Sequence, residues 1–326
     1  MILRFYRSNQ TVVQLALPLI VSVLWSLRIA FPFPVEALPD HSVFSWVPDL
    51  PPYKVRIIEA LVVLLEALLF NKLINDLELF ERVSFVPGLV YVFCAFMLIP
   101  DADFRWVTFS NLFLLPFLRL ILVVYRQPDV REESFWAGLS LGVAFCFSWT
   151  LAPLLLCGWI MMMVLKTVNW REWMMMIFGM LFPMALVQVI HYGMYGNWSA
   201  LLSEQHHLQI RFFLFGDDRA AMICWLLLLL MTIAGFFSML SRQSRSVIKI
   251  RRQRQVIMFL VVFLIGIALF SNGLFGGHPG VLLVIPVSFL VSYLVVHSNV
   301  TWISDFMLYG TLLFFLLSRV FPTASF

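Results

Sequence analysis

Long apolar runs follow one another along the chain, and short polar segments separate them. Each run is about as long as a helix must be to cross a ~30 Å hydrocarbon layer. The pattern predicts an all-α, polytopic transmembrane helix bundle of about eleven spans, within a range of about ten to twelve. The predicted spans are residues 11–31, 56–72, 83–100, 107–124, 135–151, 153–167, 174–195, 221–241, 256–270, 281–297 and 302–320.

The fifth and sixth predicted spans are divided only by the short break Ser148–Pro153. One continuous helix over both runs would be too long for the bilayer, and Pro153 disfavours an uninterrupted helix. We expect two spans joined by a tight hairpin, with a re-entrant hairpin over residues 135–167 as the alternative.

The composition supports a membrane bundle. Of the 326 residues, 62% are hydrophobic and 12% are charged, whereas soluble domains are roughly 45–50% apolar and about 25% charged. The predicted spans leave no stretch long enough for a separate extramembrane domain, so we expect residues 1–326 to form a single integral membrane domain. Arg4 and Arg7 precede the first span without a small-x-small cleavage site, which favours a retained anchor over a signal peptide.

The basic residues predict the orientation of the bundle. The net charge is +4, but the cations are distributed among short breaks, where they act on topology and do not indicate nucleic-acid binding. A cytoplasmic N-terminus puts fourteen of the 22 lysine and arginine residues inside. The positive-inside rule therefore selects the orientation with the N-terminus in the cytoplasm, and the odd number of spans then leaves the C-terminus outside. Six cations between Arg242 and Arg254 either anchor this topology or attract anionic lipid headgroups.

Ionisable side chains inside predicted spans need partners or a wet cavity, because they are costly in hydrocarbon. Glu66 follows Glu59 by seven positions, which puts both carboxylates on one helix face about 10 Å apart. Matching depths predict two intramembrane ion pairs, Glu66 with Arg119 and Glu59 with Arg28. Two alternatives stay open: Arg119 extends to the membrane surface, or the glutamates form a proton or ion pathway.

Small residues and cysteines inside the spans favour packing. Gly138 and Gly142 have the small-xxx-small spacing that permits close helix contact, either within the chain or at a dimer face. The four cysteines lack paired spacing and neighbouring histidines. They indicate neither a disulfide framework nor a zinc site.

Two outer breaks hold the candidate catalytic residues. The break 32–55 is acidic and aromatic, and Glu36 or Asp40 could act as general base for an acceptor hydroxyl. The break 271–280 has four glycines around His278, which would let its backbone approach a ligand closely. An ordinary solvated loop and a tight turn are the alternatives for these two segments.

A third outer break, 196–220, holds the candidate phosphate-binding residues. Arg211, Arg219 and His206 could bind a phosphate or a lipid headgroup, because cationic donors suit such groups. A metal site is not expected, since the neighbouring histidines His206 and His207 seldom point together, and no cofactor is expected.

Three phrases of the sequence carry a resemblance to a known family. They are Phe70–Tyr91, Ser110–Phe113 with Arg119, and Ile285–Leu290 with Trp302. The chain resembles an uncharacterised family of polytopic inner-membrane proteins typical of Bacteroidota, a domain of unknown function. The resemblance covers most of the chain and implies the same multi-pass architecture.

More distantly, Ala137–Ala144 and His278–Pro286 resemble phrases of GT-C-type glycosyltransferases. That resemblance implies a transferase of cell-envelope biogenesis that acts on a polyprenyl-phosphate-linked sugar at the outer face. Glu36 or Asp40 would be the base, and His278 would assist. The paired acidic signature of those enzymes is not reproduced here, because three residues separate Glu36 from Asp40.

Other functional classes fit the same sequence. Membrane lipid is the expected partner in every case, and a protein partner is expected if the chain is a non-catalytic subunit of a membrane complex. A transporter or flippase would instead use Glu59 and Glu66.

Overall fold

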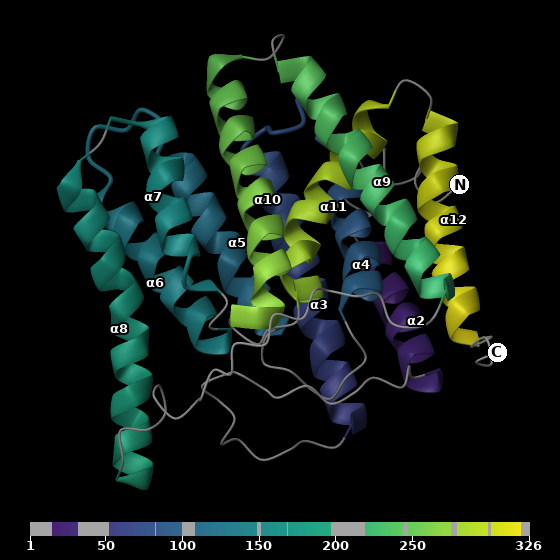
Figure 1. The fold of residues 1–326 in the computed structure, drawn as a ribbon, viewed down its shortest axis with the longest axis horizontal. Coiled ribbons are helices and arrows are strands. Elements are labelled where there is room, and N and C mark those ends of the chain that lie inside the picture. The colour runs from purple at the N-terminus through teal and green to yellow at the C-terminus, as the bar shows by residue number, and fades with distance from the viewer. Residues whose placement is uncertain are drawn as a thin grey trace.

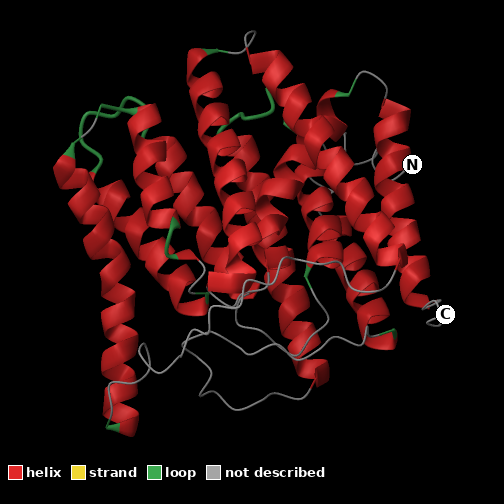
Figure 2. Ribbon diagram, in the orientation of Figure 1, coloured by secondary structure: helices red, strands yellow, loops and turns green. Residues whose placement is uncertain are grey.

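A computed structural model describes residues 15–31, 52–81, 83–99, 108–148, 151–167, 169–196, 219–243, 247–274, 279–298 and 301–320. Within these residues the structure has eleven helices and no strand (Figure 2). The helices are α2 (Leu17–Ala30), α3 (Pro52–Asp76), α4 (Val86–Leu98), α5 (Thr108–Val123), α6 (Arg131–Phe147), α7 (Leu154–Leu165), α8 (Trp170–Tyr195), α9 (Arg219–Arg242), α10 (Ile248–Leu274), α11 (Pro279–His297) and α12 (Thr301–Val320).

The all-helical class is confirmed for the described residues, and each predicted span overlaps one described helix. The number of membrane crossings stays a prediction. Among the described residues, two helical segments are long and apolar enough to cross a membrane, Trp170–Met194 and Gly280–His297. Several others are short: the 13 residues of α4 extend about 20 Å, less than the ~30 Å hydrocarbon layer.

The centre of the bundle is formed by α4 and α11. Every residue of α4 is buried, as expected of a helix that is apolar on all sides. Helix α11 packs against α4, α9 and α10, while α3 packs against α4 and α5. In Figure 1 the helices α5, α6 and α8 follow one another outward from this centre, and α8 is the outermost.

The segment 135–167, predicted as two spans or as a re-entrant hairpin, contains two separate helices. Helix α6 ends at Phe147, and the Ser148 amide still donates to the Ala144 carbonyl. Helix α7 begins at Leu154 with Pro153 as its N-cap, a position where proline's missing N–H does no harm. The two helices pack against each other.

The glycines of α6 face α8. A methyl group added at Gly138 would lie 2.1 Å from the Met176 carbonyl oxygen, and one at Gly142 would lie 2.4 Å from the Met180 carbonyl oxygen. A methyl group added at Gly179 of α8 would likewise lie 2.2 Å from the Phe135 carbonyl oxygen of α6. The small-xxx-small face therefore joins α6 to α8 within one chain.

Candidate functional site

An arginine and a glutamate from different helices form a buried ion pair at one end of α4. Arg28 Nη1 lies 2.8 Å from Glu59 Oε1, and the exposed fractions of the two side chains are 0% and 6%. Arg56 adds a second contact, Nη1 to Glu59 Oε2 at 3.0 Å. Arg28 also donates to the carbonyls of Phe96, at 3.0 Å, and Ile99. The structure thus brings together the pair expected from depth, and the arginine additionally satisfies carbonyls that the end of α4 leaves without helical partners.

The expected pairing of Glu66 with Arg119 is wrong. Arg119 Nη2 instead lies 3.4 Å from Asp76 Oδ2, and both side chains are substantially exposed, at 53% and 40%. Asp76 is the last residue of α3, whereas Glu66 lies ten residues earlier and is fully buried. The flexible arginine side chain extends to the helix end, where its charge remains hydrated, as the alternative reading allowed.

Glu66 has no cationic partner among the described residues. The Tyr91 hydroxyl of α4 donates to Glu66 Oε2 at 2.9 Å, and Glu66 Oε1 is buried without a hydrogen-bond partner. The Asn111 amide group of α5 lies near the Tyr91 hydroxyl. Asn111 Nδ2 also donates to the Val281 carbonyl at 2.8 Å. This Glu66 cluster, defined as Glu66, Tyr91 and Asn111, connects α3, α4, α5 and α11.

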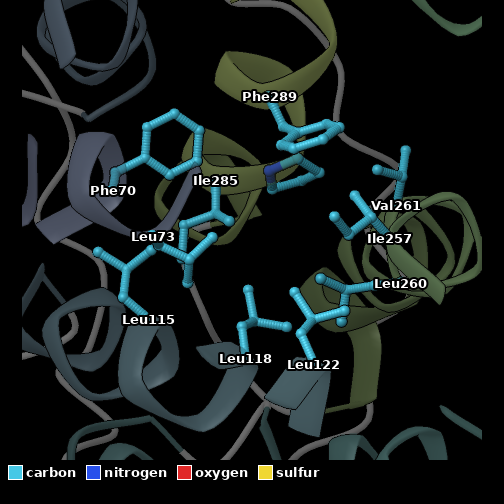
Figure 3. A pocket seen from close by; sticks show the side chains of 11 residues that line it. Phe70, Leu73, Leu115, Leu118, Leu122, Ile257, Leu260, Val261, Ile285 and Phe289 are labelled. Carbon is cyan, nitrogen blue, oxygen red and sulfur yellow. The ribbon is translucent and has the colours of Figure 1, made fainter. Parts of the chain in front are cut away.

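A small apolar cavity lies about one helical turn beyond Glu66 along α3. Figure 3 shows side chains from α3, α5, α10 and α11 around it, including Phe70, Leu115 and Phe289. Its volume is about 20 Å³, and no polar side chain lines it. The cavity has room for one water molecule, but a water molecule is not stable there because it would have no polar partner. The Glu66 cluster is therefore separated from the Asp76 end of α3 by a dry layer.

A second buried arginine was missed by sequence reasoning, which placed Arg254 in a basic surface run. Arg254 is 0% exposed, and its Nε and Nη2 atoms donate to the Leu79 carbonyl at 2.9 and 2.7 Å. Nη2 also contacts Glu81 Oε1 at 3.0 Å, and the guanidinium lies over the Tyr293 ring. Arg254 therefore binds the connection between α3 and α4 to α10 and α11.

The outer-break candidates cannot be assembled into a site. Glu36, Asp40, His206, Arg211 and His278 lie outside the described residues. Arg219 is the first residue of α9, and its side chain is likewise outside the described part. The catalytic and phosphate-binding roles of these six residues remain predictions.

No metal centre is evident in the described part of the chain, which holds no group of three or more histidine, cysteine, aspartate or glutamate side chains that could hold one ion.

The sequence carried one signal for Tyr91 and Asn111 that the predictions above did not include. Each is a polar residue inside an apolar run, where an unsatisfied polar group is costly and needs a partner.

Comparison with known proteins adds a family but no activity. No curated protein matches the sequence, and no solved structure matches the fold. Residues 49–324 match a family of unknown function, DUF6427, and because this match spans most of the chain, the protein belongs to that family.

Proposed function

We propose that this chain is a multi-pass protein of the bacterial cytoplasmic membrane that couples proton binding at Glu66 to the transport of a solute or lipid. The membrane assignment rests on apolar side chains that face outward. Only 22% of the most apolar stretch of α8 is buried, and Phe178, Phe182 and Val189 are each more than half exposed. A soluble monomer rarely exposes so continuous an apolar surface.

The transport proposal rests on the different partners of Glu59 and Glu66. Glu59 contacts two arginines, at 2.8 and 3.0 Å, so its charge is compensated and its role is structural. Glu66 has no cation partner among the described residues, and one of its oxygens lacks a hydrogen bond. An ionised carboxylate is costly in such surroundings. Glu66 therefore binds a proton in this conformation and releases it when the site becomes hydrated.

The surroundings of Glu66 suit an occluded proton site. On one side lies the Arg28–Glu59 pair, about 10 Å away along α3. On the other side lies the dry apolar layer around Phe70. For Glu66 to exchange a proton with water, either the Arg28–Glu59 pair or the apolar layer must move aside. A transporter couples a conformational change of this kind to the movement of its cargo. Buried carboxylates serve this purpose in membrane transport proteins.

The test uses the full-length protein in liposomes that contain a pH-sensitive dye, under an imposed pH gradient. The added probe is a pool of small molecules extracted from the cells that make the protein. Wild-type protein should give proton movement that depends on the extract, and Glu66→Gln should abolish it. If wild-type liposomes show no such movement, or if E66Q retains it, the proposal is wrong.

Glutamine is the informative replacement at Glu66. It keeps the shape of the side chain and an oxygen that can accept from Tyr91, but it cannot exchange a proton. A purely structural role predicts that E66Q folds and functions normally. A proton-binding role predicts that E66Q folds with wild-type stability yet is inactive.

The transferase of envelope biogenesis remains a prediction from resemblance. Its proposed base is Glu36 or Asp40, and its proposed donor is a polyprenyl-phosphate-linked sugar. The double variant E36A/D40A tests the role of the base. That hypothesis requires the variant to change the glycan profile of the cell envelope. An unchanged profile in a normally expressed variant would eliminate it.

A further inference from the structure

A second cavity, larger and more polar than the one beside Glu66, opens at the opposite end of the bundle from the Arg28–Glu59 pair. It has a volume of about 670 Å³, which is within the usual range for small-ligand sites. Its walls come from the connection between α5 and α6, the end of α7 and the start of α10. The end of α7, the start of α8, the end of α9 and the start of α10 lie at this end, the upper end in Figure 1.

Three cations line this cavity, and their surroundings differ. Lys166 donates to the Pro128 carbonyl at 3.1 Å and forms an ion pair with the buried Glu172, so its charge is compensated within the wall. Arg126 and Arg252 are exposed. Within the described part of the chain, neither forms an ion pair. The cavity therefore has two uncompensated positive charges on different elements.

The backbone at Arg126 is in a rarely used conformation. Its φ angle is 58°, in the left-handed region where a residue with a Cβ is normally disfavoured. Hydrogen bonds fix this turn, including one from the Gln127 amide to the Val124 carbonyl. A left-handed residue commonly ends a helix, and here it follows α5 at a position where Arg126 lines the cavity.

Apolar side chains share the cavity with the two arginines. Met163 and Ile248 line it and are 45% and 55% exposed. A cationic pocket bordered by exposed apolar residues matches an amphiphile with a phosphate head, because guanidinium groups bind phosphate oxygens through paired N–H donors. We propose that this cavity, the Arg126–Arg252 site, binds a phosphate group carried by an anionic lipid or by a free phosphate compound.

The test measures binding to the full-length protein by native mass spectrometry in a zwitterionic detergent. Phosphatidylglycerol, phosphatidylcholine and inorganic diphosphate are the probes. Wild type should bind phosphatidylglycerol in preference to phosphatidylcholine. The double variant R126Q/R252Q should bind it more weakly by about fivefold for each arginine, while its melting temperature stays at the wild-type value because both positions are exposed.

The matched control is R131Q/K249Q, which removes the same number of charges from nearby exposed positions outside the cavity. This control should keep binding within about twofold of wild type. An equal loss in both double variants, or no loss in either, overturns the proposal. The single variant R252Q provides the same comparison if the double variant is unstable. Competition by diphosphate identifies the phosphate group itself as the ligand, and failure to compete identifies the intact lipid.

Discussion

Arg28 and Glu59 lie 31 residues apart in the sequence and form an ion pair in which Nη1 and Oε1 are 2.8 Å apart. The pair connects α2 to α3, and the further hydrogen bonds of Arg28 to Phe96 and Ile99 add α4. One buried arginine therefore links three helices. It compensates the charge of Glu59, whereas Glu66 on the same helix has no such partner among the described residues.

Removing either partner of this pair should destabilise the protein. Arg28→Gln leaves Glu59 with one cation and leaves α4 carbonyls without a donor, so the free energy of unfolding should fall by about 3–5 kcal/mol. Thermal unfolding in detergent measures this. The control is R131Q, which breaks the exposed contact between Arg131 and Asp129 and should change stability by less than about 1 kcal/mol. Equal melting temperatures for R28Q and R131Q would refute the structural role of Arg28.

Methyl groups added to the contact between α6 and α8 should separate the helices. Gly138→Ala and Gly179→Ala each bring a methyl group within 2.2 Å of a backbone oxygen, and such overpacking costs about 1–3 kcal/mol. Gly266→Ala is the matched control, since nothing lies within 4 Å of the added methyl group. It should equal wild type or be stabilised by up to about 1 kcal/mol. The close contact is contradicted if all three variants unfold at the same temperature.

Arg254 should protect the connection between α3 and α4. Arg254→Gln removes the donors to the Leu79 carbonyl, and the loss of a buried charged hydrogen bond costs about 2 kcal/mol. Limited proteolysis should then cut within residues 77–85 faster than in wild type. The exposed Lys249→Gln lies on the same helix and should leave the cleavage rate unchanged. Equal rates for the two variants would show that Arg254 does not hold this segment.

The orientation in the membrane is testable with single added cysteines. The four native cysteines are buried, so background labelling of the wild type should be low. A membrane-impermeant maleimide should label Asn197→Cys in cells with a permeabilised outer membrane, and Lys249→Cys only after lysis, because the positive-inside rule puts Lys249 in the cytoplasm. Labelling of Lys249→Cys before lysis would reverse the orientation.

Helix positions were predictable because long apolar runs determine them, and each predicted run overlaps one described helix. Matching depths in the membrane also predicted the pairing of Arg28 with Glu59. They failed for Arg119, because depth along a helix does not determine which face a long side chain occupies, and an exposed aspartate was within reach. Hydrophobic periodicity could not separate buried Arg254 from the surface cations beside it. That distinction depends on how α10 packs against the α3–α4 connection, a contact between residues 175 apart.

Infrared difference spectroscopy of the full-length protein across a pH titration reports on the protonation of Glu66 itself. Wild type should show a carboxylic-acid carbonyl band that disappears as pH rises, is absent from E66Q, and shifts in frequency in Tyr91→Phe because the 2.9 Å hydrogen bond is lost. Other carboxyls among the 18 acidic side chains titrate in both proteins, so the comparison is between wild type and E66Q. If no titrating band distinguishes wild type from E66Q, Glu66 does not exchange a proton.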